Sequence, residues 1–273
     1  MSTDKVVIEI SNRTGQCTQA MVVFVGLTGG KEGDREVPLR KVTRLLAVLV
    51  LLLGFSPLPS LSRAQNSGFT DSFMLDKCDF ASRGRNPFFI LEPGYKLVLE
   101  GKEGKEFLRL EITVLNERKT ITGVETRVVE EVETKDGRLV EVSRNYFAIC
   151  KPNNSVVYFG EEVDIYAGGV VVSHDGAWQA GKDDAKPGLI MPGVVLLGAR
   201  YFQEIAPDVA MDRAEILSIS EVVKTPAGTF EDVLKTEETT PLEPNAKGLK
   251  FYAPGIGLIQ DSTVKLVWFS PGF

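Results

Sequence analysis

The side chains that could carry out chemistry are few and scattered along this chain. It contains one histidine, His174, and three cysteines. Ser173-His174-Asp175 has the residue types of a catalytic triad. Neighbouring side chains on a strand point to opposite faces, however, and cannot relay one proton. One histidine also excludes zinc sites built on two or three imidazoles. We therefore expect His174 to be a surface side chain at a strand end.

Motifs for phosphate binding and for nucleophilic hydrolysis are missing as well. Gly168-Gly169 and Gly181 do not complete a G-x-x-x-x-G-K-[ST] or a G-x-G-x-x-G pattern. No G-x-S-x-G elbow is present. We expect no cofactor, no metal site and no identifiable catalytic residue, and we consider an enzyme less well supported than a binding protein.

Carboxylates are the one abundant reactive group. Two sequence-local groups of acids are Glu204, Asp208 and Asp212, and Glu237, Glu238 and Glu243. Two carboxyl groups that flank a cleft can hydrolyse a glycosidic bond. A carboxylate-dependent hydrolase of envelope polymers is therefore an alternative function, although a solvated acidic face is the simpler interpretation.

A second group combines aromatic residues with a Gly/Pro-rich segment. An apolar pocket with a few polar groups is the usual composition of a small-molecule site. The segment 181–197 forms either a lid over such a pocket or a plug in the core. The candidate ligand-binding residues are Trp178, Met191, Tyr201, Phe202, Glu204, Glu243 and Tyr252.

The beginning of the chain predicts export. An unbroken apolar run, Leu45 to Phe55, follows Arg40, Lys41 and Arg44 and precedes Ser62-Arg63-Ala64. A basic stretch, a short apolar core and a small-x-small exit are the parts of a signal peptide. The run is about half of the roughly 20 residues that span a bilayer. We expect residues 1–64 to be a leader, in which 37–64 are the signal peptide and 1–36 are either a mis-annotated start or a long n-region. The product is expected to be periplasmic or extracellular, without stable membrane insertion.

The chain after this leader has 23 Lys and Arg against 32 Asp and Glu, a net charge near −9. Such a surface does not favour nucleic acid. Two cysteines remain, Cys78 and Cys150. In an oxidising compartment they either form one disulfide or stay as buried thiols.

Most of the chain after the leader shows residue patterns typical of β-strands. Residues 107–114 alternate with period two, and 124–133 meets 138–149 across Asp136-Gly137, a strong hairpin signal. Roughly ten short strands at turn-punctuated spacing predict a mainly β fold. We expect a large curved antiparallel sheet, a half-barrel or sandwich, with at most one or two short helices, one of them within 183–210. Residues 65–85 are expected to be a flexible lead-in, 175–199 an irregular loop, and 86–273 a single β domain.

Several stretches resemble a family of uncharacterised exported bacterial all-β proteins. They are NPFF at 86–89, W-x-A-G at 178–181, TPAGTF at 225–230, TPLEP at 240–244 and YAPGIG at 252–257. This resemblance implies export and β architecture, and it implies no activity or functional residue. A looser, fold-level likeness is to half-barrel lipoprotein carriers.

These observations favour an exported, non-enzymatic protein that binds a hydrophobic small molecule or an envelope partner. Besides the hydrolase, a further alternative is a structural or interaction module that pairs with another protein through an edge strand.

Overall fold

The computed structural model describes residues 68–270, and nearly all regular structure within them is β-strand. The predicted leader lies outside the described residues. The elements are η1 (Leu75–Lys77), β1 (Phe80–Ala81), β2 (Gly84–Asn86), β3 (Phe89–Leu91), β4 (Lys96–Glu103), β5 (Glu106–Ile121), β6 (Val124–Lys135), β7 (Arg138–Cys150), β8 (Ser155–Ala167), β9 (Val170–Ser173), β10 (Trp178–Gln179), β11 (Gly188–Met191), β12 (Arg200–Phe202), β13 (Arg213–Thr225), β14 (Gly228–Thr239), β15 (Lys247–Ala253), β16 (Gly257–Asp261) and β17 (Val264–Phe269).

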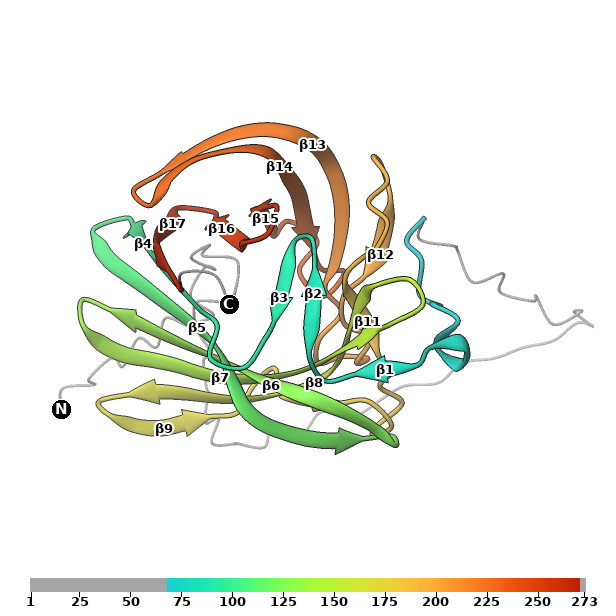
Figure 1. The fold of residues 1–273 in the computed structure, drawn as a ribbon. Helices are drawn as coiled ribbons and strands as arrows, with labels where there is room; N and C mark the ends of the chain where they lie inside the picture. Colours follow the sequence, from blue (N-terminus) through green and yellow to red (C-terminus); the bar gives the residue numbers. More distant parts are fainter. Residues whose placement is uncertain (1–67, 271–273) are drawn as a thin grey trace, which may run out of the picture. The chain divides into compact units, whose positions relative to one another are not determined.

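Fifteen of these strands form one antiparallel sheet. Its order is β10-β8-β7-β6-β5-β4-β17-β16-β15-β14-β13-β12, with β1 added to β7 and both β9 and β11 added to β8. The sheet curves strongly, so that β13 and β14 arch above the wall formed by β5 to β9 (Figure 1). It does not close into a barrel. The expectation of a large curved antiparallel sheet is confirmed.

Short turns join neighbouring strands as the sequence predicts. Asp136 and Gly137 form the two-residue turn between β6 and β7, with φ of 48° and 74°. Two positive φ angles in a two-residue loop match the twist of the flanking strands, which is why Asp-Gly is preferred there. A bulge follows at Glu133/Thr134, so that Glu133 pairs with Glu141. This register matters for the site described below.

The hairpin β2–β3 crosses the concave side of the sheet and ties its two walls together. The Asn86 amide donates to the backbone oxygens of Asn154 (2.9 Å) and Pro192 (3.0 Å) on one side. On the other side the amide of Gly255 donates to the backbone oxygen of Pro87 at 2.7 Å. The hairpin therefore fixes how far the walls stand apart at this end.

An aromatic chain fills the concave side next to this hairpin. Phe89 contacts Phe147 with ring centroids 5.1 Å apart, Phe147 contacts Tyr158 at 4.6 Å, and Tyr158 contacts Trp178 at 5.2 Å. Packed aromatic side chains contribute more apolar burial than any other residue type. These side chains pack the concave side next to the hairpin, and Phe89, Phe147 and Tyr158 also line a cavity there.

Residues 175–199 are more regular than expected. They contribute β10 and β11, both paired with β8. A Cβ on Gly188 would stand 2.0 Å from the backbone oxygen of Gln203, so only glycine fits there. No helix forms within 183–210, and η1 is the only helical element in the described part of the chain. At Gly188 the segment packs closely as part of β11 instead of forming a helix.

The segment 181–197 is neither simply a lid nor simply a plug. Met191 is buried at the edge of the sheet, whereas Ile190 lines the cavity described below. The apolar side chains that follow are exposed: Val194, Leu196 and Leu197 show 69%, 63% and 66% of their surface. Part of this segment completes the sheet, and the rest is a surface loop.

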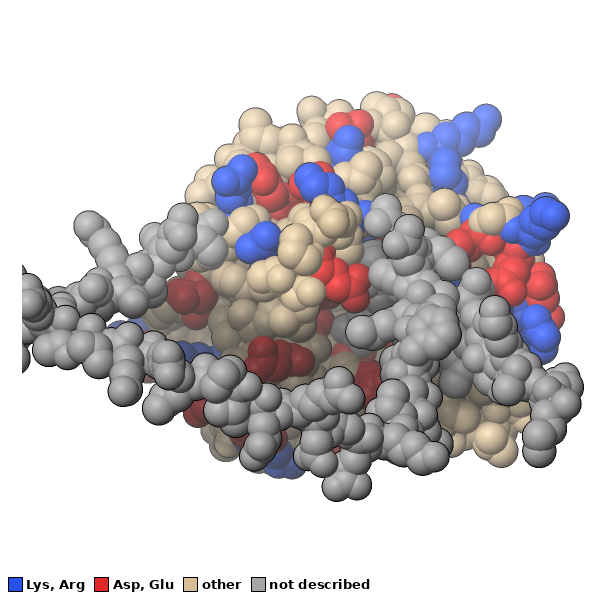
Figure 2. All heavy atoms as spheres, turned by 180° about the vertical axis from the view of Figure 1, so that it is seen from behind, with Lys and Arg blue, Asp and Glu red and all other residues tan. Residues whose placement is uncertain are grey.

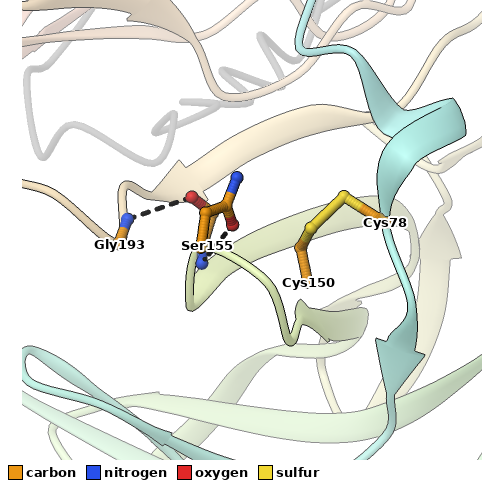
Figure 3. The surroundings of a disulfide bond; sticks show 5 residues. Cys78, Cys150, Ser155 and Gly193 are labelled. Atoms are coloured by element: carbon orange, nitrogen blue, oxygen red, sulfur yellow. Dashed lines mark hydrogen bonds between the residues drawn. A yellow bond between two sulfur atoms is a disulfide. The ribbon is translucent and has the colours of Figure 1, made fainter.

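The described part of the expected lead-in is fastened to the sheet. Cys78 forms a disulfide with Cys150 of β7, their Cα atoms 5.0 Å apart (Figure 3). Strand β1 pairs with the same end of β7, and Thr70 forms a bridge with Tyr201. A flexible lead-in was the expectation, and these three attachments hold residues 70–81 against the fold.

The ends of the sheet are built from short strands. Strands β9, β10 and β11 have four, two and four residues, and β12 has three. Strand β13 runs on beyond β12, but its pairing with β14 shifts register in three places. Short and bulged edges disfavour pairing with another chain.

No described helix is long and apolar enough to span a membrane.

Candidate functional site

A cavity of about 170 Å³ opens on the concave side of the sheet. Strands β3 to β8 form one wall and β14 to β16 the other. Figure 2 shows acidic side chains recessed in a hollow of the molecule, between an upper and a lower mass of other residues. The apolar lining includes Phe88, Phe89, Tyr95, Leu97, Leu110, Ile112, Val114, Phe147, Ile256 and Leu258, and the acidic lining is Glu131, Glu133, Glu141, Glu204, Asp212, Glu238 and Asp261.

The alternation of side chains along each strand creates this lining. Leu110 of β5 lies opposite Glu133 of β6, which lies opposite Glu141 of β7. The next row on the same face is Ile112, Glu131 and Ser143. Because side chains two residues apart share a face, the wall changes from apolar on β5 to acidic on β6 and β7.

Glu133 and Glu141 form a like-charged pair across neighbouring strands. Neither carboxylate has a hydrogen bond or an ion pair with another described residue. Burial raises the pKa of Glu133 to about 7, and the charges of Glu141, Glu103 and Asp261 add to this rise against the opposing effect of Lys135. Such a pair destabilises a sheet unless something neutralises it.

The opposite wall holds a buried ion-pair network. Lys250 lies 2.8 Å from a carboxylate oxygen of Glu238 and 3.7 Å from one of Asp261. Gln203 donates to the other oxygen of Glu238 at 2.8 Å. Burial alone would lower the pKa of Lys250, but the two carboxylates raise it well above its ordinary value. Lys250 is therefore a fixed positive charge that two acids already neutralise.

Two buried hydroxyl groups on this wall have no hydrogen-bond partner among the described residues. They belong to Tyr201, which is 3% exposed, and Thr236, which is 1% exposed. Tyr201 is in register with Ala214, which is in register with Glu238, so the three share one face of the sheet. Burial and then the charge of Glu238 raise the pKa of Tyr201. A buried hydroxyl without a partner costs stability.

Two of the ligand-binding residues proposed from the sequence, Glu204 and Tyr252, line this cavity. Trp178 packs behind Tyr158, which does line it, and Tyr201 lies on the same face of the sheet as Glu238. Phe202 faces away and packs on Phe69, with ring centroids 6.1 Å apart.

Two further proposed residues lie elsewhere. Met191 is buried at the edge beside Val156, and Glu243 lies in the turn between β14 and β15. Neither is among the residues that line the cavity.

Some residues of the two acidic groups proposed from the sequence lie together in the structure. Glu204, Asp212 and Glu238 line the same cavity, and the amide of Glu204 donates to the backbone oxygen of Asp212 at 3.1 Å. Glu237 faces the other side of β14, where it pairs with Lys247 at 3.1 Å. Asp208 occupies an exposed turn.

Five charged residues that line the cavity were not identified from the sequence. They are the acids Glu131, Glu133, Glu141 and Asp261 and the cation Lys250. The alternation around Val129 does place Glu131 and Glu133 on one face of their strand. Acids also occur at the intervening position 130, however, so the pattern did not distinguish an inward from an outward acidic face.

His174 has the surface position that we expected. Its Nδ1 lies 2.8 Å from the backbone oxygen of Val163 and 2.9 Å from a carboxylate oxygen of Asp164. The side chain is 70% exposed and does not line the cavity.

The arrangement can bind an apolar group on β5 and β3 and a polar or charged group on β6 and β7. Among the described residues, no three histidines, cysteines or acids are placed to hold a metal ion. The chain matches no protein-family model, and searches of curated proteins and of solved structures found no significant match.

Proposed function

We propose that this chain is an exported, non-enzymatic binding protein that holds a small molecule with an apolar part on the concave side of its sheet. The observation that carries the proposal is the open cavity with an apolar wall around Leu110 and Ile112. Binding sites for small molecules are typically concave and mainly apolar with a few placed polar groups.

Export is supported by the leader-like sequence and by the disulfide. Structural disulfides persist mainly in oxidising compartments such as the periplasm and the extracellular space. Cys78 and Cys150 are joined, and Cys150 is 2% exposed. A pair so placed fits a protein that folds outside the cytoplasm.

The test is a fluorescence titration with N-phenylnaphthylamine, a neutral apolar dye that brightens in apolar surroundings. We expect saturable binding to the wild-type protein. Ile112→Trp places a larger ring in the cavity and should weaken binding at least tenfold, about 1.4 kcal/mol. Leu249→Trp is the control, because Leu249 is 37% exposed and lies outside the cavity. Equal binding by both variants contradicts the proposal.

A second candidate is a hydrolase, and one observation favours it. Glu133 has a pKa raised to about 7, whereas Glu238 is held beside the ammonium group of Lys250. Carboxyl groups in such different environments are suited to act as acid and base. Release of reducing sugar from envelope polysaccharide, lost in Glu133→Gln and in Glu238→Gln, would support it. No release by the wild-type protein would exclude it.

A further inference from the structure

We propose that the ligand of this cavity is an amphipathic amine, whose positive charge is held by Glu133 and Glu141 and whose hydrocarbon part lies against Leu110 and Ile112. This inference rests on the proposed function, and it names the class of ligand.

The carboxylate pair on β6 and β7 has no ion-pair partner among the described residues. Glu133 and Glu141 lie directly opposite each other on β6 and β7, and both line the cavity. Neither has a cation within ion-pair distance among the described residues. Like charges in this position destabilise a sheet. A cation bound between them would remove the repulsion, so the pair is suited to a positively charged guest.

The lysine that lines the cavity is already paired with two acids. Lys250 is the only lysine or arginine in the described lining, and Glu238 and Asp261 flank it. The charge of Asp261 acts on Glu133 from across the cavity and raises its pKa further. The site as a whole is therefore negative, and a carboxylate or phosphate ligand would be repelled.

The apolar side chains of β5 determine where the hydrocarbon part of the ligand lies relative to its charge. Leu110 and Ile112 stand in the same cross-strand rows as the acids, one strand away. Neighbouring strands are about 4.8 Å apart. A molecule that touches both the apolar side chains of β5 and the acids of β6 must therefore have its charge within two or three bonds of its hydrocarbon part, as in an alkylamine or an aralkylamine.

The experiment compares three probes with one alkyl chain and different head groups: decylamine, decanol and decanoate. Each displaces N-phenylnaphthylamine from the purified protein at pH 8 and low salt, where Glu133 is ionised. We expect decylamine to bind at least tenfold more tightly than decanol, about 1.4 kcal/mol, and decanoate to bind most weakly.

Two variants locate the effect. In the double variant Glu133→Gln, Glu141→Gln the preference for decylamine over decanol should fall to less than threefold. Glu130→Gln is the matched control, because Glu130 lies on the same strand but pairs outward with Arg144 at 3.1 Å. It should retain the full preference. Circular dichroism of each variant confirms that it is folded.

The outcomes separate this inference from the proposed function. If the dye binds but the three alkyl probes compete equally, or the double variant keeps its preference for decylamine, the amine assignment is overturned and the binding cavity stands. Tightest binding of decanoate overturns it as well. If the dye itself does not bind, the proposed function fails, and the inference fails with it.

Discussion

Replacing Glu133 by Gln should make the protein more stable at alkaline pH and leave it unchanged at acidic pH. The pKa of this carboxyl is raised from 4.5 to about 7 in the folded chain. Between these two values the folded state keeps a proton that the unfolded state has released. The stability of the wild-type protein therefore falls as the pH rises from about 4.5 to about 7. A glutamine has no charge to bury and escapes this loss.

The magnitude follows from the shift in pKa. A pKa difference of one between the folded and unfolded states corresponds to about 1.4 kcal/mol. The rise of the Glu133 pKa from 4.5 to about 7 therefore corresponds to about 3 kcal/mol. Glu133 is only partly buried, and solvent screening reduces the effect, so we expect Glu133→Gln to gain about 2 kcal/mol at pH 8. Glu141, Glu103 and Asp261 strengthen the shift and Lys135 opposes it.

Urea unfolding of both proteins at pH 4 and at pH 8 measures this difference. The control is Glu130→Gln on the outer side of the same strand, where the ion pair with Arg144 is half exposed and contributes little. Stability curves of wild type and Glu133→Gln that run parallel over this pH range would refute the assignment of a buried, repelled carboxylate at this position.

Three further changes test other parts of the account. Replacing Cys78 and Cys150 by serine should lower the free energy of unfolding by about 4 kcal/mol, because the disulfide closes a loop with a sequence separation of 72. The shift in urea midpoint between the two proteins measures this loss. Lys250→Met leaves two buried carboxylates without their cation and should lower the free energy of unfolding by about 3 kcal/mol. This is the lower end of the usual range, because the lysine side chain is 26% exposed. Unchanged stability would contradict the ion-pair network. Gly188→Ala should lower the melting temperature by several degrees, because its Cβ would meet the backbone oxygen of Gln203 at 2.0 Å, and an unaltered melting curve would show that β11 does not pack there.

The strands could be predicted from the sequence because their signals are local. Alternation with period two over 107–114 and an Asp-Gly turn at 136 and 137 need no knowledge of distant residues. The segments that were missed depend on tertiary contacts. Strands β10 and β11 form by pairing with β8, and Gly160 of β8 and Gly188 of β11 permit close backbone contacts that no local pattern predicts.

The acidic wall could not be predicted for a related reason. A two-residue turn with Lys135 opposite Arg138 would place Glu133 opposite Val140 in a regular ladder. The bulge at Glu133/Thr134 moves the partner to Glu141 and turns two carboxylates toward each other. A bulge inserts one extra residue into one strand, and the alternation of residue types in these two strands does not predict where it occurs. The candidate residues Phe202 and Met191 are next to lining residues in the sequence, Gln203 and Ile190, but their own side chains do not line the cavity.

Methyl NMR of the protein titrated with N-phenylnaphthylamine tests the central claim most directly. If the dye binds on the concave side, chemical-shift changes are expected at the methyl groups of Leu97, Leu110 and Ile112, which line the cavity, and none at the exposed Leu217 and Leu249. Changes confined to Leu217 and Leu249, or no change at any of the five, would contradict a binding site on the concave side of the sheet.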